Sequence, residues 1–237
     1  MEGLILAGGM GTRLQSSAMG LPKPMFPIEG KPFLWYLLKY LSVSGFQRLV
    51  ISTGFMADRI SDFFGSRLDG TTIEYSQEET PLGTGGAVLH ALPLMQGDCF
   101  PVFNGDTFLE LDPRKLLQWH VENGCDITIA LRELQNFERY GCITLTKGKM
   151  VETFSEKKSR QSGLINAGVY VMSRKSLKGL KLPEKFSLET ELLQKNPDQL
   201  KIGGFVSQGY FIDIGVQEDY NRACREIPGL LNSVCGR

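Results

Sequence analysis

The stretch LILAGGMGTRL, residues 4–14, joins an apolar run to three glycines, a threonine and an arginine. A short continuous apolar run is typical of a strand buried on both faces of a parallel sheet, so residues 4–7 predict such a strand. Its carboxyl end carries glycines, which let a ligand approach the backbone closely, and then the fixed positive charge of Arg13. The stretch predicts a phosphate-binding loop; the alternative is a tight strand-to-helix turn whose glycines serve packing.

Two common phosphate-binding loops are excluded. A dinucleotide-binding loop of the form G-x-G-x-x-G, placed on Gly9 and Gly11, requires a small residue where this chain has Leu14. A Walker loop requires Gly-Lys followed by Ser or Thr, a combination that the sequence lacks. The loop therefore needs support from the rest of the chain.

The composition restricts the class of protein. The chain has 237 residues, with 26 basic and 26 acidic side chains and a formal net charge of zero. Without a basic block, neither a nucleic acid nor a membrane surface is expected as a partner. No apolar stretch reaches the roughly 18 residues of a membrane span, and no basic leader precedes the first strand, so a cytoplasmic location is expected. Formation of a homo-oligomer is left open.

Cysteine and histidine offer little chemistry. The five cysteines form no C-x-x-C pair, so the pattern predicts reduced thiols rather than a disulfide framework or a zinc knuckle. The two histidines, His90 and His120, fall in helix-like segments and are expected at helix surfaces. A mechanism built on a histidine base or a histidine-rich metal site is therefore poorly supported.

Strand-like and helix-like runs alternate through the first half of the chain. Strands are expected at residues 48–53, 72–76 and 100–104, and helices at residues 32–45, 56–65 and 85–95. This alternation predicts an α/β fold with a Rossmann-like, doubly wound, mostly parallel sheet. Ligands lie outside the carboxyl ends of the strands in such a sheet, and LILAGGMGTR and FPVFNGD both contain such an end.

The second half of the chain is richer in strands. The runs DITIALREL, GCITLTKGKMVETFSEK, LINAGVYVMS and GYFIDIG predict a mixed-sheet extension folded over the first half, with a hairpin turn at KGK. Helices are expected near residues 187–194 and 216–227. Because the sequence contains no repeat, low-complexity tract or linker, residues 1–237 are expected to form a single domain.

Three charged residues extend the predicted phosphate site. Lys23 lies between Pro22 and Pro24, which stiffen the backbone around its ammonium group. Asp106 in NGDTF and Asp213 in YFIDIG each follow an apolar strand-like run. Mg²⁺ is usually held by one or two carboxylates and by substrate phosphates, so the pair predicts one magnesium ion bound together with a nucleotide. Taken singly, each aspartate also fits a turn or a helix cap.

Three further motifs offer backbone or polar side chains to a ligand. PLGTGGA at residues 81–87 offers bare backbone to a nucleobase. SEKK at residues 155–158 and INAG at residues 165–168 offer polar groups to hydroxyls and to a second anion. For SEKK the alternative is an exposed charged turn.

Together these motifs resemble one family. GGMGTRL, PKP, PLGTGGA, NGD, EK, NAG and a late DIG, in this order over nearly the whole chain, resemble the sugar-1-phosphate nucleotidylyltransferases, also called nucleotide-sugar pyrophosphorylases. Within that family, PLGTGGA, NGDTF, ERYG at residues 138–141, LINAG and YFIDIGVQEDY are most similar to the branch that transfers a guanylyl group to D-glycero-D-manno-heptose 1-phosphate. The resemblance implies two substrates, a nucleoside triphosphate with GTP favoured and a sugar 1-phosphate, and a product used for surface polysaccharides.

The implied reaction needs no nucleophilic side chain. An oxygen of the sugar phosphate attacks the α-phosphorus of the nucleoside triphosphate in line, and pyrophosphate leaves. The enzyme positions two anions that repel each other and stabilises the charge on the leaving group, with Mg²⁺ as the implied cofactor.

The resemblance also implies a role for individual residues. Arg13, Lys23 and Asp106 are the implied catalytic residues, and Asp106 and Asp213 the metal ligands. The implied nucleotide-binding residues are Leu6, Ala7, Gly8, Gly9, Gly11, Thr12, Glu78, Pro81, Gly83, Thr84 and Gly85. The implied sugar-phosphate-binding residues are Gly141, Glu156, Lys157, Asn166 and Gly168. Residues 1–110 then form the nucleotide-binding half and residues 111–237 the sugar-phosphate-binding half.

The base is the least determined part of the substrate. One edge of guanine presents two donors that a single carboxylate accepts, and strand alternation turns only one of the neighbours Glu78 and Glu79 toward the cleft. We favour Glu78 as the guanine-binding residue; the alternative is a pair of solvated acids at a strand end.

The sequence departs from the family pattern at one motif, and two alternative functions are retained. The family form Glu-Lys-Pro is replaced here by Glu156, Lys157 and Lys158, so either lysine is a candidate for the sugar phosphate. A uridylyl- or thymidylyltransferase for a hexose or amino-sugar 1-phosphate would share the fold and the catalytic residues. A non-catalytic regulatory subunit that binds a nucleotide sugar is disfavoured, because the implied catalytic and metal-binding residues are all present.

Overall fold

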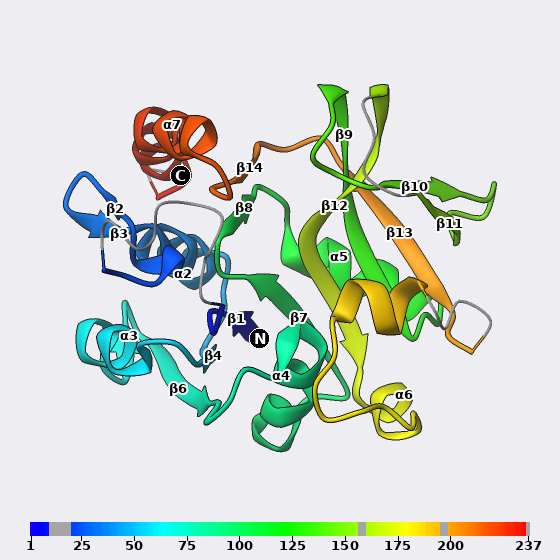
Figure 1. Cartoon of the computed structure of the whole chain (residues 1–237), viewed down its shortest axis with the longest axis horizontal. Helices are drawn as coiled ribbons and strands as arrows, with labels where there is room; N and C mark the ends of the chain where they lie inside the picture. The colour runs from blue at the N-terminus through cyan, green and yellow to red at the C-terminus, as the bar shows by residue number, and fades with distance from the viewer. Residues whose placement is uncertain (10–19, 156–159, 195–198, 236–237) are drawn as a thin grey trace.

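The computed structural model describes residues 1–9, 20–155, 160–194 and 199–235, and it has the predicted α/β architecture (Figure 1). A ten-stranded sheet runs through the molecule in the order β11-β10-β12-β7-β1-β4-β6-β5, and β9 pairs with both β12 and β13. The parallel pairs that join β1, β4, β6 and β7 come from the first half of the chain, whereas the second half adds mostly antiparallel pairs and one parallel pair, β9 with β13. The predicted fold class is confirmed.

The first half supplies the parallel strands β1 (Glu2–Leu6), β4 (Arg48–Thr53), β6 (Thr71–Gln77) and β7 (Cys99–Asn104), with β5 (Arg67–Leu68) as an antiparallel edge. Its helices are α2 (Phe33–Val43), α3 (Ala57–Phe64) and α4 (Gly83–Ala91), the last continued by the 3-10 turn η2 (Leu92–Leu94). Before α2 lie the 3-10 turn η1 (Lys23–Met25) and the short strands β2 (Pro27–Ile28) and β3 (Lys31–Pro32). The strands and helices predicted in this half are present, with small differences at their ends.

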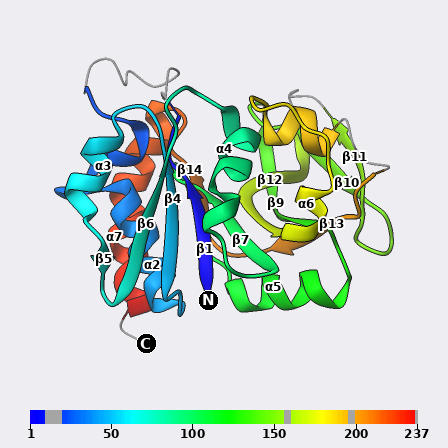
Figure 2. The same ribbon diagram turned by 90° about the horizontal axis from the view of Figure 1, so that it is seen from below.

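Helices cover both faces of the parallel strands (Figure 2). Leu4 and Val50 pack with residues of α4, whereas Ile5 and Ile51 pack with residues of α2 and α7 on the opposite face. All four side chains are fully buried. Burial on both faces is the physical reason for the continuous apolar run at the start of the chain.

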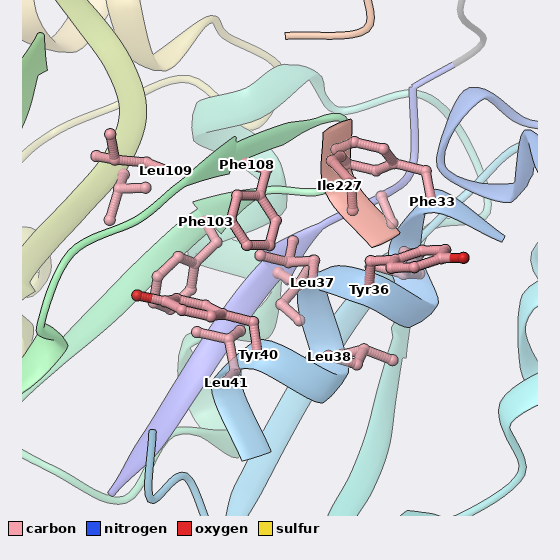
Figure 3. Close-up of a cluster of buried hydrophobic side chains, with 14 of the residues drawn as sticks. Phe33, Tyr36, Leu37, Leu38, Tyr40, Leu41, Phe103, Phe108, Leu109 and Ile227 are labelled. Atoms are coloured by element: carbon pink, nitrogen blue, oxygen red, sulfur yellow. The ribbon is translucent and has the colours of Figure 1, made fainter. Parts of the chain in front are cut away.

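Aromatic and aliphatic side chains fill the core beside α2 (Figure 3). Tyr40 and Phe108 pack with ring centroids 5.0 Å apart, and Leu37 lies next to them. The Tyr40 hydroxyl donates to the carbonyl of Leu111 at 2.7 Å and accepts from the Leu111 N–H at 3.0 Å. These contacts hold α2 against the segment that follows β8.

The second half forms the predicted strand-rich extension. Its strands are β9 (Ile127–Phe137), β10 (Cys142–Leu145), β11 (Val151–Ser155), β12 (Arg160–Ser173), β13 (Ile202–Ser207) and β14 (Phe211–Asp213). Strand β8 (Thr107–Leu109), at the end of the first half, pairs with β14. Its helices are α5 (Pro113–Glu122), α6 (Arg174–Lys178), the π-helical segment η3 (Leu188–Gln194) and α7 (Gln217–Cys235). Strand β12 runs antiparallel to β7, β9 and β10, so both halves share one sheet. The single domain and its division at residue 110 stay interpretations of the sequence.

The hairpin turn predicted at KGK is confirmed, because the Thr146 N–H donates to the Met150 carbonyl at 2.9 Å between β10 and β11. The helix predicted to end at residue 227 is longer than expected, since α7 continues through Pro228 to Cys235. Ile227 and Leu231 are both buried in the core beside α2. Packing of this apolar face maintains the helix beyond a proline that would end an isolated one.

The prediction of a surface position is wrong for His120, which is 1% exposed. Its Nε2 lies 3.0 Å from the Ser173 hydroxyl and its Nδ1 lies 2.8 Å from the Thr128 hydroxyl. Burial lowers the pKa of His120 to about 4, so the ring is neutral at physiological pH. His90 is exposed, as predicted.

The structure also bears on the cysteines and on membrane-spanning helices. Cys99, Cys125, Cys142 and Cys224 are free thiols. Among the described residues, no helix is both long and apolar enough to cross a membrane.

Candidate active site

Hydrogen bonds join the ends of three parallel strands. The Gly105 N–H donates to the Leu6 carbonyl at 2.8 Å, which attaches the NGD motif after β7 to the end of β1. The Ala7 N–H donates to the Ser52 carbonyl at 2.8 Å, which attaches the end of β1 to β4. Asp106 therefore lies beside the end of β1, where the predicted nucleotide-binding loop begins.

A second pairing brings the two predicted metal ligands together. Strands β8 and β14 are antiparallel with Asp213 opposite Thr107, and the Ile214 N–H donates to the Asp106 carbonyl at 3.0 Å. Lys23 Nζ donates to Asp106 Oδ2 at 2.7 Å. Three residues that are far apart in the sequence thus form one charged cluster, as predicted.

The charges in this cluster suit a divalent cation. Burial raises the pKa of Asp213 to about 6, the Asp106 carboxylate adds to the rise, and the Lys23 ammonium opposes it. A hard cation between the two carboxylates would favour the ionised form of both. Among the described residues, no group of three or more histidine, cysteine, aspartate or glutamate side chains is arranged so that it could hold a metal ion. The site therefore fits an ion that takes its remaining ligands from substrate oxygens and water.

A cavity of about 960 Å³ opens beside the charged cluster. Its volume lies within the range of roughly 300–1,000 Å³ that is usual for small-molecule sites. Both halves of the chain contribute to its wall. The predicted site residues that line it are Thr84, Asp106, Gly141, Asn166, Gly168 and Asp213.

Hydroxyl groups and one carboxylate form a hydrogen-bonded network in the cavity wall. The buried Tyr170 hydroxyl donates to Glu189 Oε1 at 3.1 Å and accepts from Asn166 Nδ2 at 2.8 Å. Glu189 Oε2 accepts from the hydroxyls of Thr84 at 2.9 Å and Ser187 at 3.1 Å. Burial raises the pKa of the Tyr170 phenol well above its usual value, so its proton stays in place. The network holds the Glu189 carboxylate in one orientation.

The NAG motif interrupts β12 at the cavity. The register with β9 shifts between Asn166 and Tyr170, and Gly168 has a φ of +69°, which side-chain-bearing residues rarely adopt. The Asn104 Oδ1 atom is buried in the same wall and has no hydrogen-bond partner among the described residues. A buried acceptor of this kind is suited to a ligand hydroxyl.

The glycines of PLGTGGA pack closely against another segment of the chain. The Gly85 N–H donates to the Phe186 carbonyl at 3.0 Å, and a Cβ on Gly85 would lie only 2.1 Å from the Phe186 ring. Close packing therefore accounts for Gly85 without a ligand. The contacts of Gly83, Gly85 and the exposed Pro81 with a nucleobase stay predictions. Thr84 faces the same cavity as the predicted sugar-binding residues.

Glu78 is half-buried and Glu79 is exposed, so only one of the two neighbours is turned inward, although both lie after the end of β6. Glu78 Oε1 accepts from the Ser52 hydroxyl at 3.0 Å, and Oε2 accepts from the Leu82 N–H at 3.0 Å. A Cβ on Gly8 would lie 2.8 Å from Oε1, so the carboxylate borders the nucleotide loop. Glu78 thus connects β4, the start of α4 and that loop, and its contact with guanine stays a prediction.

Several predicted residues lie outside the part of the chain that the structure describes. They are Gly11, Thr12, Arg13, Glu156, Lys157 and Lys158. Their roles, and the choice between the two lysines, stay predictions from the resemblance.

Sequence reasoning missed Glu189 and Tyr170. The sequence does indicate that Glu189 is unusual. It lies three positions before Leu192 and four before Leu193, both buried, and this spacing puts it on the apolar face of a helix. A carboxylate on an apolar face needs polar partners or a ligand. Tyr170 carried no such signal, since a tyrosine in the strand-like run AGVYVMS reads as core.

Comparisons with known proteins agree with the geometry. A family model described as nucleotidyl transferase matches residues 2–228. The chain is 42% identical over 227 residues to the D-glycero-alpha-D-manno-heptose 1-phosphate guanylyltransferase of Aneurinibacillus thermoaerophilus, which covers 96% of this chain and 98% of that protein. It is 40% identical over 220 residues to the protein of that name in Campylobacter jejuni, covering 93% and 97% of the two chains.

A solved structure extends the likeness to the fold. The crystal structure of HddC from Yersinia pseudotuberculosis complexed with GMP-PN superposes with a TM-score of 0.86 at 38% identity, covering 95% of this chain and 98% of that one. The fold and the enzyme class predicted from the sequence are confirmed. The chain belongs to the nucleotidyl transferase family.

Proposed function

We propose that this chain transfers the guanylyl group of GTP to D-glycero-D-manno-heptose 1-phosphate, releasing pyrophosphate and forming a GDP-heptose. The nearly full-length likeness to two guanylyltransferases named for this sugar, and to HddC complexed with GMP-PN, supports both substrates. The observation that carries the proposal is the single cavity in which Asp106 and Asp213 meet the polar residues of the NAG motif. A phosphate-binding cluster and a hydroxyl-binding wall are needed together for this reaction.

The chemical step is an in-line displacement. An oxygen of the sugar phosphate forms a bond to the α-phosphorus of GTP, and the bond from that phosphorus to the bridging oxygen breaks, so pyrophosphate carries away the electron pair. The Lys23 ammonium, held 2.7 Å from Asp106 Oδ2, places a positive charge beside the reacting phosphates. Mg²⁺ held by Asp106 and Asp213 would neutralise negative charge on the leaving pyrophosphate.

The remaining side chains in the cavity bind and orient the sugar. Asn104 Oδ1 and the Glu189 carboxylate offer acceptors to hydroxyls, and the Asn166 amide oxygen accepts from the Gly168 N–H at 3.0 Å in the same wall. A heptose has one more hydroxyl-bearing carbon than a hexose, so a wall rich in acceptors suits it. Fixing the sugar fixes its phosphate for attack.

Three further parts of the proposal follow from this activity. Mg²⁺ is the cofactor, and the protein acts in the cytoplasm, where GTP is available. The GDP-heptose formed is a donor for surface polysaccharides such as lipopolysaccharide, capsule or S-layer glycan.

The test measures pyrophosphate release with each of GTP, UTP, dTTP and CTP against heptose, mannose, glucose and N-acetylglucosamine 1-phosphates. We expect GTP with the heptose 1-phosphate to give the highest kcat/KM. A preference for UTP or dTTP with a hexose or amino-sugar phosphate would contradict the guanylyl assignment. Nucleotide-sugar binding without pyrophosphate release from any pair would indicate the regulatory alternative.

A further inference from the structure

The turn between β9 and β10 places an arginine in the wall of the cavity. Arg139 lines the same cavity as Asp106 and Asp213, and among the described residues that line it Arg139 is the only basic one. Its side chain is 39% exposed and therefore accessible to a ligand. The wall also carries the Glu189 carboxylate. Two of the three acidic side chains, Asp106 and Asp213, are assigned to Mg²⁺, so a further cation in the wall favours the binding of a second phosphate group.

Neighbouring rings hold the guanidinium in place. Arg139 Cζ lies 5.3 Å from the centroid of the Tyr140 ring, and Nη2 lies 3.2 Å from the Tyr140 hydroxyl. Tyr140 itself packs against Phe137 and Phe211, with ring centroids 6.4 Å and 6.0 Å away. A planar guanidinium fixed on an aromatic ring loses little conformational entropy when it binds an anion.

Asp219 in the first turn of α7 is the anion that Arg139 now contacts, through Nη2. Helix α7 follows directly after β14, which carries Asp213 (Figure 1). Asp219 also pairs with Arg222 at 3.5 Å. The carboxylate therefore keeps a cationic partner when Arg139 turns to another anion.

Arg139 retains donors for such an anion. Its hydrogen bonds to described residues all use Nη2, so within the described part of the chain the Nε and Nη1 donors have no hydrogen-bond partner. Arg139, Asp106 and Asp213 line one cavity, so these donors lie on the same side of the molecule as the two carboxylates.

We propose that Arg139 binds the phosphate group of the sugar 1-phosphate, and that Asp219 competes for its guanidinium until that substrate arrives. The sugar phosphate is favoured over the triphosphate because of where the turn lies. Gly141 packs against the carbonyl of Ser155, and β10 pairs with β12 at Ile165, next to Asn166. Arg139 thus belongs to the sugar-binding wall rather than to the nucleotide loop at Gly8. The proposal rests on nucleotidyl transfer to a sugar 1-phosphate, but not on any particular sugar or base.

The experiment compares Arg139→Ala with Asp219→Asn, using whichever sugar 1-phosphate and nucleotide the wild-type protein prefers. We expect Arg139→Ala to raise the KM for the sugar 1-phosphate at least tenfold and to leave the KM for the nucleotide within twofold of wild type. We expect Asp219→Asn to lower the KM for the sugar 1-phosphate, because it removes the competing charge. Inorganic phosphate is used as a competitor of the sugar 1-phosphate. It should inhibit Arg139→Ala more weakly than the wild type, and it should not inhibit Asp219→Asn more weakly.

The matched control is Arg132→Ala. Arg132 lies on β9, bonds to the Ser207 carbonyl and to Gln208, and is not part of the cavity wall. Arg132→Ala should leave the KM for the sugar 1-phosphate and the KM for the nucleotide unchanged.

Two results would overturn the proposal. One is an unchanged KM for the sugar 1-phosphate in Arg139→Ala. The other is a more than threefold rise of the KM for the sugar 1-phosphate in Asp219→Asn, which would show that the Arg139–Asp219 ion pair only stabilises the fold. A wild-type protein that prefers another sugar phosphate would contradict the proposed heptose substrate and leave the comparison of variants valid.

Discussion

Two groups of polar side chains at one cavity differ in how they are paired. The cluster of Lys23, Asp106 and Asp213 contains two carboxylates and one ammonium group. Burial raises the pKa of Asp213, and the neighbouring Asp106 carboxylate adds to the rise. In the network of Tyr170 and Glu189, three hydroxyl donors contact one carboxylate. The first arrangement needs a charged ligand, whereas the second is complete without one.

The difference indicates a division of labour. Groups left with uncompensated charge interact most strongly with the charge that moves during phosphoryl transfer. Groups already fixed by hydrogen bonds act as a rigid template for neutral hydroxyls. We therefore expect the charged cluster to control kcat and the Tyr170–Glu189 network to control which sugar is accepted.

The largest effect is expected at the metal ligands. Asp106→Asn and Asp213→Asn should each lower kcat roughly a thousandfold, which is about 4 kcal/mol of transition-state stabilisation. Both variants should keep the wild-type circular dichroism spectrum, because an amide fits the space of a carboxylate. A chelator should abolish wild-type activity and added Mg²⁺ should restore it. Full wild-type activity in excess chelator would show that the reaction does not need a metal ion.

The second effect is a change in the free energy of unfolding at His120, which is buried and has no predicted role in ligand binding. Its pKa of about 4 lies below the usual 6.5, so between these pH values the unfolded chain takes up a proton that the folded chain does not. His120 should therefore reduce the free energy of unfolding as the pH falls from 6.5 to 4, by about 3 kcal/mol in total. Asp213, with its raised pKa, acts in the opposite direction over the same range.

Urea unfolding of the wild type and of His120→Gln across this pH range separates the two groups, since Asp213 titrates in both proteins. The free-energy difference between them should shrink as the pH falls, because only the wild type carries the histidine. A difference that is independent of pH would show that His120 keeps an ordinary pKa.

The smallest effect is expected from two matched tyrosines. Tyr170→Phe and Tyr40→Phe each remove a buried hydroxyl that makes two hydrogen bonds, so each should lower the free energy of unfolding by about 1–2 kcal/mol. Only Tyr170→Phe should also raise the KM for the sugar 1-phosphate, by a few-fold, because it releases Glu189 and Asn166. Equal effects of both changes on KM would mean that the network has no special role.

The sequence predicted the parallel half of the fold better than the sugar-binding wall. Residues 4–7 and 49–51 form continuous apolar runs because both faces of these strands are buried, and such local patterns can be read directly. The contacts of Tyr170 with Glu189 and of Arg139 with Asp219 join elements that only the folded chain brings together. The continuation of α7 through Pro228 depends in the same way on burial of Ile227 and Leu231. Local rules do not contain this information.

The division of labour is tested most directly by one ratio, kcat/KM for heptose 1-phosphate over kcat/KM for mannose 1-phosphate, with GTP. It is measured in the wild type, in Lys23→Ala and in Tyr170→Phe. We predict that Lys23→Ala lowers both values roughly a hundredfold and leaves the ratio unchanged, since about 3 kcal/mol of charge stabilisation is lost for either sugar. Tyr170→Phe should change the ratio with little loss of kcat. A ratio altered by Lys23→Ala and unaltered by Tyr170→Phe would contradict the account.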